Sequence, residues 1–165
     1  MDDLLVEQQV ELEQFGNPPR FDVRMFPLLG MEKPRNTVLI PAVSEAHRTV
    51  VEEIGRQFRR ELGFDFVPFD ATDPECEGIL IDSRKFLATF PIAAGAAGFE
   101  RDGDRWIMKW VWLHPYERGT GRFTDTWNEM ERRYGEFYIE GPYSPMMEAF
   151  IRKHGINPNR HERFD

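Results

Sequence analysis

The stretch WIMKWVWLHPYERGTGRF, residues 106–123, decides the fold of this chain. Its first part, residues 106–113, is rich in aromatic and apolar residues and favours a strand. Alternation along that strand would put four large side chains on one side, namely Trp106, Met108, Trp110 and Trp112. Its last part is rich in glycine and leads into a run with helical spacing of apolar residues. The stretch therefore predicts a strand, a glycine-rich loop and a helix, in that order.

The glycine-rich loop, residues 118–121, has the features of an anion site. At the start of a helix the backbone N–H groups lack partners within the helix, and the helix dipole adds positive charge there. Glycines allow such N–H groups to converge on an oxyanion, and Arg118 and Arg122 add charge on either side. The loop therefore indicates a site for phosphate or pyrophosphate. The alternative is a tight loop whose glycines serve the turn geometry alone.

The neighbouring segments extend this unit in both directions. Upstream, a small-residue strand over 90–99 is joined to the strand over 106–113 by Asp102-Gly103, a strong hairpin signal. Downstream, a helix starting near Phe123 stops at Gly135, and a short strand follows over 137–140. A last helix opens with Ser144-Pro145 and ends at Gly155.

The first half of the chain adds strands over 37–40, 64–69 and 78–81. A helix capped by Ser44 and stopped by Gly63 follows the first of these strands. Strands and helices mixed in this order predict an α/β or α+β domain with a central sheet. We expect that domain to span residues 36–165. Residues 1–35, with a short amphipathic helix over 2–14, are too short to bury a core and are expected to be an N-terminal extension.

Composition narrows the class of protein. The chain has 165 residues, a net charge of −8 and a sequence pI of about 5.1. Broad nucleic-acid binding requires a basic face, so this charge argues against it, although a small pocket for one anion remains compatible. No run approaches the roughly 20 apolar residues of a membrane span, and no signal peptide is visible, so we expect a cytoplasmic protein. The single cysteine, Cys76, lies among acidic residues that should raise its pKa.

The pattern His114-Pro115-x-x-Arg118-Gly119-x-Gly121, between a strand and a helix, resembles the signature of the GNAT superfamily of N-acyltransferases. The resemblance covers residues 91–156, because the hairpin, the strand over 137–140 and the last helix match the family's order. It implies a GNAT-like mixed central sheet flanked by helices, with a truncated C-terminal end after Ile156. A segment within 17–35, or a second subunit in a homodimer, would then supply a compensating strand.

The resemblance also implies the activity. An acyl group, most simply acetyl from acetyl-CoA, would pass to an amine of a small molecule or a protein. Pantetheine would insert between the strand ending at Leu113 and the strand over 137–140, with the acyl carbonyl near the backbone of residues 111–113. The acidic surface would favour a cationic acceptor. The residues implied in binding the cofactor are Trp112, Leu113, Arg118, Gly119, Thr120, Gly121, Arg122, Phe123 and Ser144.

Four departures from the family pattern bear on catalysis, the mildest being Ser144, which stands where Asn commonly bonds pantetheine. Phe123 replaces a small residue of the signature, Lys109 stands where many members carry a glutamate base, and Ile151 aligns with the usual tyrosine acid. The substitutes that we predict nearby are two tyrosines as acids and a glutamate as base, namely Tyr138, Tyr143 and Glu100, with Glu140 and His114 as further candidate bases. An inactive GNAT-like module that binds a partner is the alternative. No metal site is expected, because His154 and His161 lack a third ligand.

Overall fold

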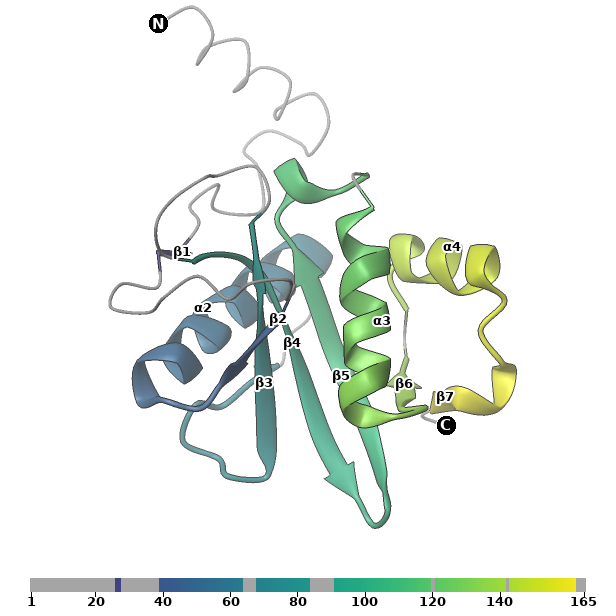
Figure 1. The fold of residues 1–165 in the computed structure, drawn as a ribbon, viewed down its shortest axis with the longest axis horizontal. Coiled ribbons are helices and arrows are strands. Elements are labelled where there is room, and N and C mark those ends of the chain that lie inside the picture. Colours follow the sequence, from purple (N-terminus) through teal and green to yellow (C-terminus); the bar gives the residue numbers. More distant parts are fainter. Residues whose placement is uncertain are drawn as a thin grey trace, which may run out of the picture.

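The computed structural model describes residues 26–27, 39–63, 68–83, 91–119, 121–141 and 143–162. Within these ranges one sheet of seven strands has the order β2-β3-β4-β5-β6-β7, and β1 pairs with β4 (Figure 1). The strands are β1 (Phe26–Pro27), β2 (Leu39–Ala42), β3 (Cys76–Asp82), β4 (Ile92–Asp102), β5 (Arg105–Leu113), β6 (Tyr138–Glu140) and β7 (His161–Glu162). The α-helices are α2 (Glu45–Leu62), α3 (Arg122–Tyr134) and α4 (Pro145–His154), and short 3-10 helices span Pro115–Glu117 and Pro158–Arg160.

Strand direction makes this a mixed sheet. Strands β2 to β5 pair antiparallel, whereas β5 pairs parallel with β6 and β6 parallel with β7. The predicted hairpin is confirmed, because β4 and β5 are joined by Gly103-Asp104, with Gly103 at a φ of 63°. The mixed central sheet flanked by helices, which the resemblance implies, is therefore confirmed.

The helix boundaries follow the capping residues. The Ser44 side chain accepts a hydrogen bond from the His47 amide at the start of α2, and Gly63 ends that helix at a φ of 72°. Ser144 caps α4 in the same way, through the Met147 amide. These local signals fixed both helices at their predicted positions.

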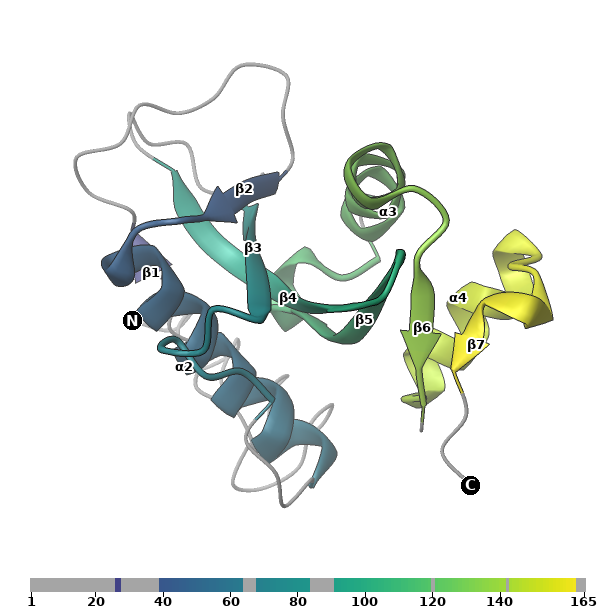
Figure 2. The ribbon, with the colours of Figure 1, turned by 90° about the horizontal axis from the view of Figure 1, so that it is seen from below.

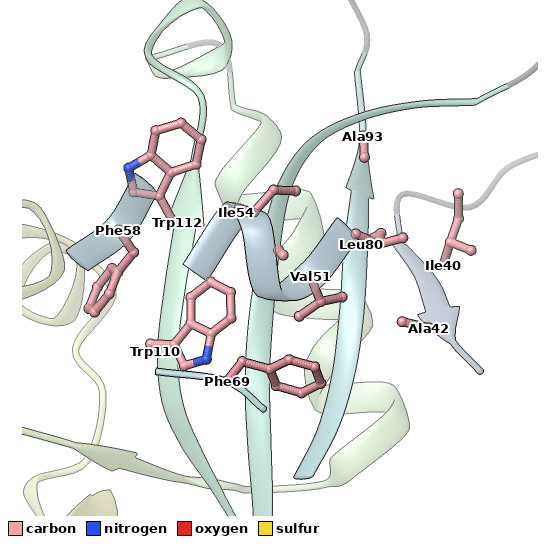
Figure 3. Close-up of a cluster of buried hydrophobic side chains, with 11 residues drawn as sticks. Ile40, Ala42, Val51, Ile54, Phe58, Phe69, Leu80, Ala93, Trp110 and Trp112 are labelled. Atoms are coloured by element: carbon pink, nitrogen blue, oxygen red, sulfur yellow. The ribbon is translucent and has the colours of Figure 1, made fainter. Parts of the chain in front are cut away.

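Two hydrophobic clusters lie on opposite faces of the sheet. Helix α2 packs on one face through Val51, Ile54 and Phe58 (Figure 3), and helix α3 packs on the other through Trp127 and Met130. Neighbouring residues of one strand alternate between the two clusters, as their pleat requires. Figure 2 shows α2 and α3 on the two sides of the sheet, with α4 beside β6 and β7.

A β-bulge at Lys109 overturns one expectation. The pairing of β4 with β5 passes from Gly98 with Trp110 to Phe99 with Met108, which leaves Lys109 as an extra residue. The bulge shifts the alternation, so Trp110 faces α2 whereas Met108 faces α3. The prediction that all four large side chains of this strand share one side is therefore wrong. Trp112 joins Trp110, and Trp106 joins Met108.

Short strands from both ends of the chain join the sheet. Phe26–Pro27, within the predicted extension, pairs with Ala93 and Ile92, just beyond the point where β5 ends. After α4, His161–Glu162 pairs with β6 and forms the C-terminal edge. The helix predicted over 2–14 lies outside the described residues, as do residues 64–67 of the strand predicted over 64–69, whereas residues 68–69 are described and belong to no strand. The domain boundary near residue 36 stays a prediction. No helix in the described ranges is long and apolar enough to cross a bilayer.

Candidate functional site

The sheet opens into a wedge next to the end of β5. Strand β5 pairs with β6 at Ile107 and Met108, and within the described ranges no strand pairs with residues 109–113 on that side. No described strand therefore covers the β5 backbone at Val111–Leu113 on that side, although the Leu113 carbonyl accepts a hydrogen bond from the Arg118 Nε. A gap beside Leu113 is the feature that the sequence predicted for a pantetheine arm.

A cavity of about 600 Å³ occupies this wedge. Four parts of the chain line it: the last turns of α2, the end of β5, the loop before α3 with the first turn of that helix, and α4. The lining residues are Phe58, Glu61, Leu62, Val111, Trp112, Leu113, Arg118, Gly119, Phe123, Ser144, Pro145, Met146, Met147, Ala149, Phe150 and Lys153. Its size is that of a small-molecule or cofactor site.

The start of α3 borders this cavity through Gly119 and Phe123. Gly121 caps the helix at a φ of 80° without any side-chain cap, and Gly119 has a φ of 76°. In the part of the chain that the structure describes, no acceptor is found for the amides of Gly119, Gly121 or Phe123. A Cβ at either glycine would meet no atom within 4 Å. These amides, which we call the amide cradle, are therefore not capped by the described protein groups. Thr120, between them, lies outside the described residues.

The phenyl ring of Phe123 packs against α4. It packs edge-on against Phe150 of α4, with ring centroids 4.7 Å apart, and lies 6.3 Å from the ring of Trp127. The bulky residue at this position of the signature thus serves the contact between α3 and α4 while it lines the cavity.

Arg118 does not direct its charge at the amide cradle. Its Nε donates to the carbonyl oxygen of Leu113 at 2.7 Å, and its two terminal nitrogens donate to the two oxygens of Glu61 at 2.6 and 2.7 Å. The guanidinium carbon also lies 5.5 Å from the ring centroid of Trp112. The sequence suggested a cation beside the anion, but the structure gives an ion pair that joins α2 to the end of β5.

Arg122 is likewise directed into the protein. The residue is buried, and its Nε donates to the carbonyl oxygen of Asp82 at 2.8 Å, with a second bond from Nη2 to the same atom. Its guanidinium group therefore ties the start of α3 to the end of β3. If Arg118 and Arg122 bind the cofactor, they would do so through their backbone amides, and this role stays a prediction.

Glu61 is a cavity residue that sequence reasoning missed. Burial would raise the pKa of this carboxyl, but the hydrogen bonds and charge of Arg118, with a hydrogen bond from the Trp112 indole, hold it below its ordinary value. Glu61 therefore stays ionised at neutral pH. The available signal was its place on α2 between the apolar residues Phe58 and Leu62.

The structure places the predicted catalytic residues outside the lining of the cavity. The Tyr143 hydroxyl donates to the Ile139 carbonyl at 3.2 Å, and the Arg105 guanidinium covers the ring of Tyr138. Glu100 lies 3.5 Å from the Nζ of Lys109, which also contacts Glu140 at 2.5 Å. Burial would lower the pKa of Lys109, but the two carboxylates outweigh it and raise that pKa. The catalytic roles of Tyr138, Tyr143 and Glu100 stay predictions.

The other residues of interest lie around the same cavity. Ser144 and Trp112 line it, as predicted for cofactor binding. His114 is buried next to Trp112, and its electrostatic interaction with Glu61 is the smallest of the causes that lower the pKa of that carboxyl. Ile151 packs in the cluster under α3. Among the described residues, no group of three or more His, Cys, Asp or Glu side chains is arranged to hold a metal ion.

Comparison with known proteins adds one distant likeness. No family model matches the sequence, and no curated protein matches it. A solved structure from Bacteroides thetaiotaomicron, described as a "putative acetyltransferase from GNAT family", is similar to this chain at 14% sequence identity and a TM-score of 0.45. The match covers 72% of this chain and 69% of that one. A likeness this distant does not bear on activity, so the functional argument rests on the geometry of the wedge and the amide cradle.

Proposed function

We propose that this protein is an acyl-CoA-dependent N-acyltransferase. One observation carries the proposal: the amide cradle at the start of α3 and the end of β5 that no described strand covers border the same cavity. A diphosphate fits the first feature, because unpaired helix amides bind phosphate. An extended arm with amide groups fits the second, because it can pair with exposed strand backbone.

The chain would act mainly by positioning. The thioester carbonyl would lie against the backbone of residues 111–113, where an N–H can stabilise the developing oxyanion. The amine nitrogen then attacks the carbonyl carbon, and the C–S bond breaks. The leaving thiolate takes up a proton and becomes the thiol of CoA. The amine loses its own proton to a base or to water. Holding the two reactants in line supplies much of such a rate, so modest help from side chains suffices.

A second function is favoured by the state of the acidic groups. Glu61, the one carboxylate among the described lining residues, is ion-paired with Arg118. Glu140 and Glu100 are both within ion-pair distance of Lys109. A module that binds CoA or a partner without turnover would have this arrangement. Measuring the CoA released when the protein is given an acyl-CoA and a panel of amines distinguishes the two functions. Binding of the acyl-CoA without release of CoA would support the module.

Thermal unfolding with CoA tests the proposal directly. A ligand at one hundred times its dissociation constant stabilises the folded state by about 2.7 kcal/mol, so the midpoint should rise by several degrees. Gly121→Ala should weaken this rise, because a side chain at a φ of 80° strains the amide cradle. Gly155→Ala is the matched control: Gly155 has a φ of 60° at the end of α4, so it shares the strain but not the cradle. No stabilisation by millimolar CoA or acetyl-CoA would overturn the proposal.

A further inference from the structure

Part of the cavity lining is apolar. Its chemistry indicates which acyl group would be transferred, an inference that rests on the function just proposed. Five apolar residues of the lining form what we call the apolar wall, namely Phe58 and Leu62 of α2, Val111 of β5, and Met146 and Phe150 of α4. Met146 is 54% exposed, one of two large hydrophobic residues that the described surface leaves so open. Covering such a wall with hydrocarbon removes apolar area from water and stabilises the complex.

Two of the three charged residues in the described lining, Glu61 and Arg118, cancel each other, and the third, Lys153, is exposed on α4. Glu61 and Arg118 form a two-bond ion pair, with their side chains 18% and 15% exposed. The indole of Trp112 donates to the same carboxylate, and the Leu113 carbonyl accepts the remaining guanidinium Nε. A charged ligand group buried against this pair would lose its hydration without gaining a counter-ion. The wall therefore suits an uncharged chain better than the cationic acceptor suggested by the overall acidity.

The position of the wall relates it to the acyl donor. Gly119 and Phe123 of the amide cradle line the same cavity as Phe58 and Leu62. A ligand held by its phosphates at the cradle and running along the end of β5 would thus bring its far end to the apolar wall. We propose that this wall holds the hydrocarbon chain of an acyl thioester longer than acetyl. Glu61 acts as the specificity residue, because it neutralises Arg118.

Dissociation constants measured by calorimetry on the full chain test the chain-length part. The ligands are CoA, acetyl-CoA, octanoyl-CoA and succinyl-CoA. Each fully buried methylene contributes about 0.8 kcal/mol, or roughly fourfold in affinity, so octanoyl-CoA should bind at least tenfold tighter than acetyl-CoA. Succinyl-CoA, with its terminal carboxylate, should bind more weakly than octanoyl-CoA. Equal affinities for acetyl-CoA and octanoyl-CoA would overturn this inference. Binding of CoA in the same experiment would still support the proposed function. No binding of CoA itself would overturn both.

A substitution that removes the charge of Glu61 tests its proposed role in specificity. Glu61→Gln leaves the Arg118 guanidinium without its carboxylate, so the affinity ratio of succinyl-CoA to octanoyl-CoA should rise at least tenfold. A gain common to all ligands cancels in this ratio. Glu53→Gln is the control, because it removes an ion-paired carboxylate of the same helix that does not line the cavity. An unchanged ratio in a folded Glu61→Gln protein would overturn the role of Glu61.

A second pair of variants tests the apolar wall as the acyl site, and this test remains available if Glu61→Gln does not fold. Ala149 is exposed on α4 and lines the cavity, so Ala149→Trp narrows the space without disturbing the core. The preference for octanoyl-CoA over acetyl-CoA should then fall at least fivefold. Arg152→Trp, on the same helix but outside the described lining, should leave this preference as it is. The same loss in both variants, or in neither, would count against the apolar wall as the acyl site.

Discussion

Glu61 and Arg118 show how one pair of side chains can set the character of a site. Removing a carboxylate and a guanidinium from water costs several kcal/mol, and only close pairing with further hydrogen bonds offsets that cost. Here both oxygens of Glu61 are bonded, and Arg118 has a third acceptor in Leu113. The pair therefore ties α2 to the end of β5 and carries no net charge of its own, which leaves Lys153 as the remaining charged residue of the described lining.

Loss of this pair should appear as a pH-dependent change in stability. At pH 7, Glu61→Gln should lower the free energy of unfolding by about 3 kcal/mol, because it strands a half-buried guanidinium. The folded-state pKa of Glu61 lies below its ordinary value of 4.5, so its stabilisation is present above 4.5 and disappears as the pH falls through the folded value. Urea unfolding between pH 7 and pH 3 measures the gap between wild type and variant. A gap that stayed constant to pH 3 would contradict this account, and Glu53→Gln should show little effect at any pH.

Cys76 offers a second prediction at this scale. Burial, followed by the charge of Asp73, raises the pKa of its thiol from 9.0 to about 11, which confirms the direction expected from its acidic neighbours. At pH 8 the thiolate fraction should therefore be about 100-fold lower than that of an unperturbed cysteine. Alkylation by iodoacetamide should be slower in the folded protein than in urea by a similar factor. The two rates should converge as the pH approaches 11, and equal rates at pH 8 would show that the thiol is unshielded.

The sequence predicted elements well where a local rule decides and poorly where a distant partner decides. Ser44 and Gly63 bound α2 because capping depends on a few adjacent residues. The face of Trp106 depended instead on the bulge at Lys109, which arises from pairing with β4 and has no mark in the local alternation. In the same way the Arg118 guanidinium was expected at the anion, but its partner Glu61 lies 57 residues away in the chain.

The glycines of β4 illustrate a requirement that acts between elements. A Cβ at Gly98 would lie 2.2 Å from the Nε1 of Trp110, so the indole of β5 lies directly across this glycine. At Gly95 a Cβ would lie 2.5 Å from the backbone oxygen of Trp112. Strand β4 can therefore keep β5 in its observed place only while these positions lack side chains.

Gly98→Ala should destabilise the protein by about 1–3 kcal/mol, the usual cost of overpacking. The added methyl displaces the Trp110 ring, which packs on Phe58 with ring centroids 5.7 Å apart. The same substitution in a Trp110→Phe background should cost less, because the smaller ring leaves room for the methyl. Denaturant unfolding of the four proteins in this cycle measures the coupling. Additive effects would show that the indole does not make the contact.

At the scale of the whole molecule, the sheet consists of two unequally joined parts. Strands β2 to β5 form a continuous antiparallel sheet, whereas in the ranges that the structure describes β6 pairs with β5 only at Ile107 and Met108, beside the ion pair of Lys109 with Glu140. Packing of α3 and α4 supplies the remaining connection, through Phe123, Trp127 and Phe150. A ligand in the wedge would touch both parts, since its walls come from α2 and β5 on one side and α4 on the other.

This architecture predicts a graded pattern of amide hydrogen exchange. In the free protein, amides of β3 and β4 should exchange with the free energy of global unfolding, because they are paired on both sides within a buried sheet. Amides of β6 and β7 should exchange faster, through openings that leave the antiparallel part intact. Saturating CoA should slow exchange in three places together: β6, the end of β5 and the first turn of α3. Protection confined to α3 would mean that the diphosphate binds at the amide cradle while the pantetheine arm stays outside the wedge. The end of β5 would then no longer support the proposed transferase.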